Sequence, residues 1–159
     1  MEYNKSVSNP MLMGAIELVK AENTPAHKKM VSDEIVRATF LSPAKVTPAP
    51  QPGETKLGSG VNVQFPVLAA PNGKQYFMAF TDMAELKKWR NEEDQQTLSM
   101  TFEEYASLMF KKDSQSPAAG MVINPFGINI IVPKEMVAQY IAARMAQERA
   151  KAAPPDPQE

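Results

Sequence analysis

The sequence lacks cysteine and has only one histidine among its 159 residues. The absence of cysteine excludes a disulfide framework, a thiolate zinc site and a cysteine nucleophile. His27 has no second histidine with which to form an ordinary catalytic zinc site, and no G-x-S-x-G elbow offers a serine for it to activate. We therefore expect His27 to be exposed and incidental, and we predict no metal, no cofactor and no catalytic residue.

Neither sign of charge is in excess, and the sequence has no long apolar run. Seventeen basic and eighteen acidic side chains give a formal net charge of −1, so we expect no nucleic-acid or membrane partner. No stretch approaches the ~20 apolar residues that a membrane span needs. The apolar run from Met11 to Ile16 stops at Glu17, which is too soon for a signal peptide. We expect a soluble, cytoplasmic protein.

The residues that are present fit one folded domain. At 43% hydrophobic and 22% charged, the composition lies near the globular average. The 14 prolines are about twice the number expected from an average usage of roughly 5%, and they concentrate in residues 43–52 and 154–157. We expect a single α+β domain over residues 1–151, with a flexible Pro/Gly-rich loop at 47–60 and a disordered tail at 152–159.

Helix starts are marked by capping signals. Asn9-Pro10 and Thr24-Pro25 each indicate an N-cap followed by proline in the first turn, which predicts helices over residues 10–22 and 25–37. Later in the chain, two capping-box patterns predict two short helices. These patterns are Asp82-x-x-Glu85 and Thr101-x-x-Glu104.

A final helix is predicted to begin at Pro133. Its apolar residues follow the spacing of one helix face, which we expect to point inward. This face consists of Met136, Val137, Tyr140, Ile141 and Met145.

The clearest strand pattern is "VNVQFPVLAAPNGKQYFMAF", residues 61–80. Asn72-Gly73 favours a two-residue type I′ turn, which would set Val67 opposite Met78 and Phe65 opposite Phe80. Further strands are expected in "ATFLSPAKV", around Thr97–Met100 and on both sides of the Asn-Pro turn described next. These elements predict an α+β fold with a mixed or antiparallel sheet of about five or six strands and helices packed on it. The expected apolar face of the hairpin consists of Val63, Phe65, Val67, Tyr76, Met78 and Phe80.

Two apolar runs in "GMVINPFGINIIV" flank Asn124, Pro125, Phe126 and Gly127. Asn124 and Pro125 at the first two positions, with Gly127 in the left-handed conformation, fit a type I turn with a G1 bulge. Phe126 either folds back onto the domain or projects as an aromatic anchor, and we favour the first reading because single exposed apolar residues are common. These four residues are the candidate interaction surface.

Three segments together carry a resemblance to a known family. They are "FPVLAAPNGKQYFMAFTDMAELKKW", "GMVINPFGINIIV" and the helix pair that leads into "ATFLSP". Their order and spacing over residues 9–145 resemble the N-terminal domain of the SseB family, which is named for enhanced serine sensitivity protein B. The resemblance implies an α+β, bacterial, intracellular protein and supplies no catalytic residues.

Two functions stay open at this point. The leading hypothesis is a non-enzymatic protein-interaction or regulatory module that binds a protein partner or self-associates; it rests on the missing catalytic constellation and on aromatic residues on both strand faces. The alternative is a domain that binds a small molecule, such as an amino-acid sensor, as the family name suggests. An enzyme ranks third, because the acidic clusters at 92–94 and 103–104 are better explained as solvated positions.

Overall fold

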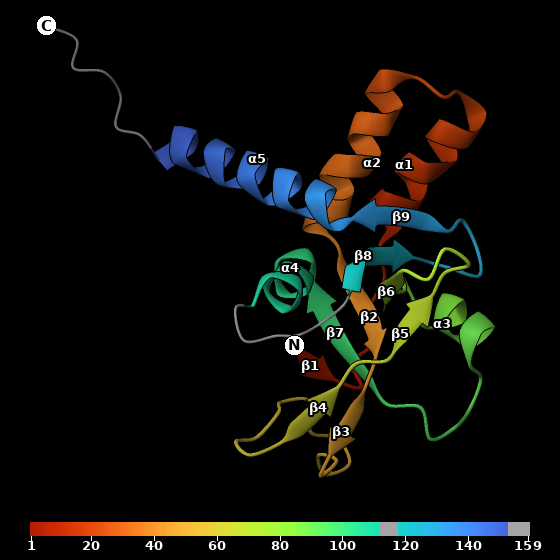
Figure 1. Ribbon diagram of the computed structural model, residues 1–159, viewed down its shortest axis with the longest axis vertical. Coiled ribbons are helices and arrows are strands. Elements are labelled where there is room, and N and C mark those ends of the chain that lie inside the picture. Colours follow the sequence, from red (N-terminus) through yellow and green to blue (C-terminus); the bar gives the residue numbers. More distant parts are fainter. Residues whose placement is uncertain (112–117, 153–159) are drawn as a thin grey trace, which may run out of the picture.

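The computed structural model describes residues 1–111 and 118–152 of the chain. In these residues five helices and nine strands form a mixed α+β domain (Figure 1), which confirms the predicted class. The helices are α1 (Pro10–Ala21), α2 (Pro25–Arg37), α3 (Met83–Trp89), α4 (Phe102–Phe110) and α5 (Lys134–Ala152). The strands are β1 (Glu2–Tyr3), β2 (Thr39–Pro43), β3 (Lys45–Thr47), β4 (Asn62–Gln64), β5 (Val67–Ala69), β6 (Gln75–Ala79), β7 (Thr97–Thr101), β8 (Ala118–Ile123) and β9 (Ile130–Pro133).

The described strands form three sheets. Their orders are β1-β7-β2, β3-β4 and β5-β6-β8-β9, and the last sheet is mixed because β6 and β8 run parallel. Leu41 and Phe80 exchange backbone hydrogen bonds of 2.8 and 2.9 Å, which join β2 to the end of β6 and so connect the first sheet to the third. Figure 1 shows the β3–β4 pair at one end of the molecule and the α1–α2 hairpin at the other.

Two apolar clusters hold these layers together. The larger one joins α1, α2, α4 and α5 to the sheets through side chains such as Leu12, Ile35, Phe102 and Val137. The smaller cluster packs Leu86 of α3 against the other face of the strands. Its buried members are Leu41, Tyr76, Met78, Phe80, Leu86 and Val122.

The predicted register of the first hairpin is wrong by one residue. Val67 pairs with Phe77, and the turn contains three residues, because the Ala70 N–H donates to the Lys74 carbonyl and the Gly73 N–H donates to the Ala70 carbonyl at 2.8 and 2.9 Å. Gly73 alone among the loop residues has a positive φ, of 82°. The reason is Pro71: its fixed negative φ suits the second position of a type I turn, and the following glycine completes the bulge.

That one-residue slip places the predicted apolar residues of β6 on the opposite face from those of the preceding segment. Phe77 belongs to the larger cluster, with Val63, Phe65 and Val67 beside it. The other residues predicted for the same face, Tyr76, Met78 and Phe80, lie in the smaller cluster. In addition, β4 pairs with β3 in a separate sheet and does not extend the hairpin.

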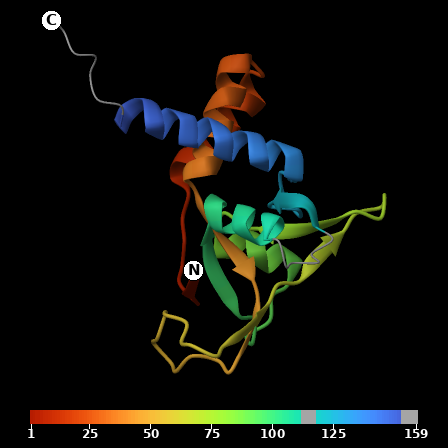
Figure 2. The same ribbon diagram turned by 60° about the vertical axis from the view of Figure 1, so that its left-hand side comes forward.

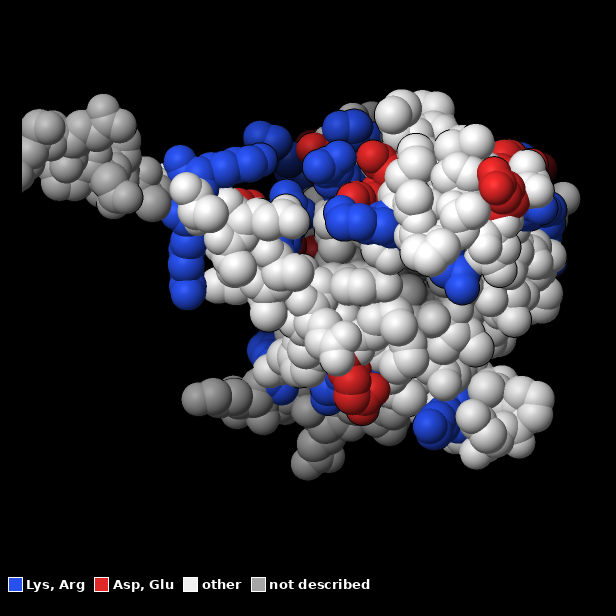
Figure 3. Space-filling view, turned by 90° about the horizontal axis from the view of Figure 1, so that it is seen from above, with Lys and Arg blue, Asp and Glu red and all other residues white. Residues whose placement is uncertain are grey.

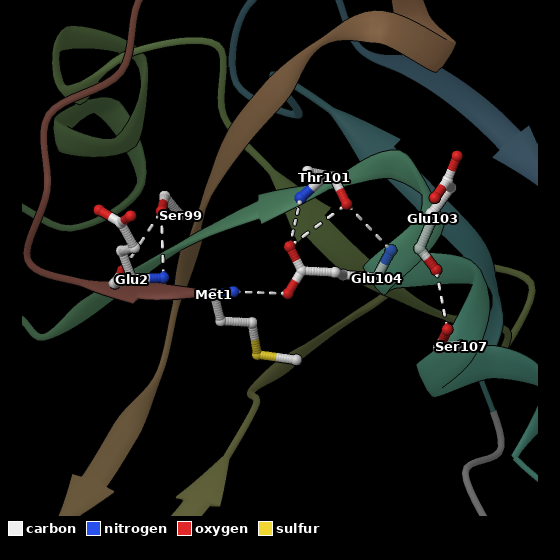
Figure 4. Close-up of polar contacts among 7 residues, drawn as sticks. All are labelled: Met1, Glu2, Ser99, Thr101, Glu103, Glu104 and Ser107. Carbon is white, nitrogen blue, oxygen red and sulfur yellow. Dashed lines mark hydrogen bonds and ion pairs between the residues drawn. The ribbon is translucent and has the colours of Figure 1, made fainter. Parts of the chain in front are cut away.

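Three of the predicted caps form, and one does not. The Thr24 side chain accepts a hydrogen bond from the His27 N–H at 3.1 Å, and Asp82 accepts one from the Glu85 N–H at 2.9 Å. Thr101 and Glu104 form both halves of the predicted capping box, and the Met1 ammonium binds the free oxygen of Glu104 at 2.7 Å (Figure 4). Asn9 makes no side-chain cap, since its amide is used elsewhere in the fold.

Helix α5 is less buried than its pattern predicts. Val137 is fully buried, whereas Met136 and Met145 are 37% and 48% exposed. The helix crosses α2 and extends past the body of the domain (Figure 2), and most residues of its C-terminal half are exposed. Two residues attach its central part to α2. The Tyr140 hydroxyl lies 3.1 Å from the Ser32 hydroxyl, and the Arg144 guanidinium donates to the Val36 carbonyl at 2.7 Å.

The connection between Thr47 and Asn62 contains no helix or strand, as expected for the loop at 47–60. It is tied to β1, because the Tyr3 N–H donates to the Thr55 carbonyl at 2.6 Å. Residues 153–159 of the predicted tail lie outside the described residues, and α5 runs to Ala152. Every helix in the described parts of the chain is too short or too polar to cross a membrane.

Candidate interaction surface

The turn between β8 and β9 differs from the predicted type I turn with a bulge at Gly127. Ile123 pairs with Ile130, so the connection covers all of residues 124–129. The left-handed residues are Asn124 (φ 48°) and Asn129 (φ 54°), while Gly127 has no positive φ. Asparagine tolerates this conformation better than most residues, which lets the turn close around the Asn124 carbonyl without a left-handed glycine. The N–H groups of Gly127 and Asn129 both donate to that carbonyl at 2.9 Å.

Asn124 is buried, so it is not part of an exposed surface. Its side chain is 1% exposed and binds Thr81 twice: the amide oxygen accepts from the Thr81 N–H at 3.0 Å, and the amide nitrogen donates to the Thr81 hydroxyl at 2.9 Å. The backbone N–H of Asn124 also donates to the Ala79 carbonyl at 2.9 Å. These bonds hold the β8–β9 turn against the junction between β6 and α3.

Asn9 extends the same polar cluster to the start of α1. Its amide nitrogen donates to the carbonyls of Thr39 and Thr81, both at 2.9 Å. The cluster thus joins α1, β2, the β6–α3 junction and the β8–β9 turn. Sequence reasoning missed it because Asn9 and Asn124 lie 72 and 43 residues from Thr81, and no local pattern reports such distant partners.

The other three candidate residues are at least partly accessible. Pro125 is half-buried, Gly127 is exposed, and Phe126 is 51% exposed at the tip of the turn. Gly127 lies directly over α3, where an added Cβ would be 2.7 Å from a carboxylate oxygen of Glu85. The ring of Phe126 therefore projects from a turn whose two ends are firmly anchored, and it is more exposed than the favoured prediction allowed.

An apolar groove lies on the α1–α2 side of this turn. Its volume is about 300 Å³, and its walls come from α1, α2 and the β8–β9 turn with the start of β9. Lys20 of α1 and Lys28 of α2 are the charged residues that line it. The face of the domain that carries α1, α2 and α5 shows a wide area without charged side chains (Figure 3). The apolar residues of the groove are Ile16, Val19, Val31, Ile128 and Ile130.

A second, larger hollow of about 650 Å³ lies between the β3–β4 pair and the segment that follows α3. Phe65 and Trp89 provide apolar walls, and Lys45, Arg90 and Asp94 provide charge. Two of these charged groups are already engaged, since Arg90 donates to Asp94 at 3.2 Å and to Gln95 at 2.6 Å. The hollow is therefore a mostly apolar, partly preorganised concavity with charged groups at its wall, and it is distinct from the groove beside α1 and α2.

The side chains considered for catalysis are dispersed. His27 is half-buried, and its Nδ1 lies 2.7 Å from the Glu22 carbonyl oxygen. Glu104 is held in the capping box, and residues 92–94 are exposed. Within residues 1–111 and 118–152, no three or more His, Cys, Asp or Glu side chains are placed to hold a metal ion together.

The fold and the order of its segments define a mixed α+β domain. Residues 12–139 match the family model described as the SseB protein N-terminal domain. Because this match covers most of the chain, the protein belongs to the SseB family, and the resemblance carried by the three segments is confirmed. No curated protein and no solved structure matches the chain.

Proposed function

We propose that this domain is a non-enzymatic protein-interaction or regulatory module of the bacterial cytoplasm. The observation that carries the proposal is the apolar groove beside the anchored β8–β9 turn, with Phe126 half-exposed at its tip. Aromatic residues and apolar pockets of this kind contribute most of the binding energy at protein interfaces. A rigid turn also lowers the entropy that binding costs, because its conformation is set before a partner arrives.

The polar cluster explains why the turn would be a useful docking element. Asn124 and Thr81 fix its base, and Ile128 and Ile130 contribute to the groove from the same segment. A partner that buried these side chains would gain about 25 cal/mol for each Å² of apolar surface removed from water. The turn itself would not need to fold on binding.

Affinity capture from the native lysate tests this function. We expect the wild-type protein to retain a partner at about 0.15 M salt. Val19→Asp places a charge in the groove and Phe126→Asp removes the exposed ring, so both should lose that partner. Met145→Asp is the matched control, because Met145 is 48% exposed but belongs to α5, which does not line the groove. Equal recovery by all four folded proteins would contradict the proposal.

A second candidate function is small-molecule binding, including amino-acid sensing, in the hollow lined by Trp89. Its volume of about 650 Å³ falls within the range of ligand pockets, roughly 300–1,000 Å³. Trp89 is the single tryptophan of the chain, so its fluorescence reports on this hollow directly. A titration with amino acids and nucleotides should change the emission of wild type and not that of Arg90→Ala. If no compound changes the emission or the melting temperature, this candidate is removed.

A further inference from the structure

We propose that the groove between α1, α2 and the β8–β9 turn receives a short acidic segment of a partner protein, with aliphatic side chains on the groove floor and carboxylates against Lys20 and Lys28. This inference rests on the proposed interaction function and names the chemistry of the partner.

The floor of the groove sets the apolar part of the segment. Five aliphatic side chains line the groove. Ile16, Val19 and Val31 belong to the α1–α2 hairpin. Ile128 of the β8–β9 turn and Ile130 of β9 form the opposite side. A volume of about 300 Å³ is at the small end of the usual pocket range, which suits a few side chains of one segment better than the surface of a folded domain. Aliphatic side chains match such a floor because it presents no charged group to them.

The rim of the groove sets the charge of the segment. Its two charged residues are both lysines, and no carboxylate lines it. Lys20 lies 3.1 Å from Glu17, but both side chains are more than half exposed, so this pair contributes little and can give way to a partner's carboxylate. Among the described residues, no carboxylate lies within ion-pair distance of Lys28.

The position of Lys28 also favours a partner segment that carries carboxylates. Lys28 is in the first turn of α2, after the Thr24 cap and Pro25, so it adds to the partial positive charge of a helix N-terminus. Lys20 is in the last turn of α1, and the two lysines therefore bring cationic groups to the groove from both helices of the hairpin. Complementary charge at a rim steers association and selects partners more than it adds affinity.

Peptide display on the immobilised full chain tests the inference. Short random peptides are selected on wild type and then counter-selected on Val19→Asp. The peptides that depend on the groove should carry acidic residues among aliphatic ones. A labelled, selected peptide should bind Lys28→Glu about tenfold more weakly than wild type, and more weakly still in high salt. Lys74→Glu is the charge-matched control, because Lys74 is exposed in the β5–β6 turn.

A charge exchange separates this inference from a general loss of folding. The selected peptide with its acidic residues changed to lysine should bind Lys28→Glu better than it binds wild type. The inference is overturned if the selected peptides show no acidic preference, if Lys28→Glu and Lys74→Glu bind alike, or if no peptide depends on the groove. Groove-dependent capture from lysate combined with any of these results would leave the interaction module standing and remove only the acidic segment.

Discussion

The side chain of Asn124 binds Thr81 through two hydrogen bonds, of 3.0 and 2.9 Å, although the two residues are 43 positions apart in the sequence. Both residues are buried, so neither can exchange these bonds for bonds to water. The pair joins the β8–β9 turn to the start of α3, and the shape of the candidate interaction surface depends on it.

Removal of the Asn124 side chain should therefore destabilise the domain strongly. Asn124→Ala leaves the buried Thr81 N–H without its partner and keeps a left-handed φ, and we expect a loss of about 2–4 kcal/mol in the free energy of unfolding. Asn129→Ala is the matched control, since Asn129 has a similar φ of 54° but is exposed. Its expected loss is about 1 kcal/mol. Urea unfolding measures both, and equal losses would show that the two hydrogen bonds add nothing.

Gly120 of β8 should not tolerate a side chain. An added Cβ would overlap the Val132 carbonyl oxygen and lie 2.9 Å from the Cα of Pro133, and the φ of Gly120 is 158°. Gly120→Ala should separate β8 from β9 and lower the melting temperature. Gly14 of α1 is the opposite case, because nothing lies within 4 Å of its Cβ position. Gly14→Ala should raise the free energy of unfolding by about 0.5–1 kcal/mol. A stable Gly120→Ala variant would contradict the close approach of the two strands.

Tyr105 should make the fold sensitive to alkali. It is fully buried, its hydroxyl donates to the Met78 carbonyl at 2.8 Å, and burial raises the pKa of Tyr105 above its ordinary value of 10.0. The unfolded chain releases this proton near pH 10, whereas the folded chain retains it. The stability that Tyr105 contributes is therefore complete below pH 10 and is lost as the pH rises toward the folded pKa.

Tyr105→Phe tests that assignment. At neutral pH the variant should be less stable by about 1 kcal/mol, because it lacks the hydrogen bond to Met78. Above pH 10 its stability should fall less steeply than that of wild type, since phenylalanine has no proton to release. Chemical unfolding at a series of alkaline pH values gives both slopes. Parallel slopes would show that Tyr105 does not control the alkaline response.

The capping box at α4 should contribute measurably to stability. The Thr101 hydroxyl accepts from the Glu104 N–H at 3.3 Å, and Glu104 accepts from the Thr101 N–H at 3.2 Å. Thr101→Ala removes one half of the box and should cost about 1 kcal/mol. Thr101→Ser keeps the hydroxyl and should lower the free energy of unfolding by only a few tenths of a kcal/mol. Thermal unfolding of the two variants distinguishes the cap from the loss of a methyl group.

Local signals were sufficient for the class of fold and for much of its order. Thr24 and Thr101 cap their helices as predicted, because a cap involves residues only three positions apart. The strands around Thr97 and on both sides of the Asn-Pro turn follow from apolar runs that are short and bounded by turn residues. The segments that resemble the SseB family lie within residues that the family model matches.

Signals that depend on distant partners were misread. Asn9 has the sequence context of a cap, yet its amide donates to two carbonyls on other elements. In the first hairpin, the effect of Pro71 on the turn outweighed the Asn-Gly pattern and placed the side chains of β6 on the faces opposite to those predicted. The inward face predicted for α5 assumed a surface along its whole length, which the domain does not provide.

The sequence by itself determined the positions of the helices, the α+β class and the family, because capping, apolar periodicity and segment order are local properties of the chain. Only the tertiary structure decided what the β8–β9 turn presents to a partner. Asn124 can be buried because Thr81 provides hydrogen bonds that replace those of its amide to water, and Phe126 is half-exposed at the tip above that anchored base. The groove exists only where the α1–α2 hairpin meets the β8–β9 turn, which lies far from that hairpin in the sequence.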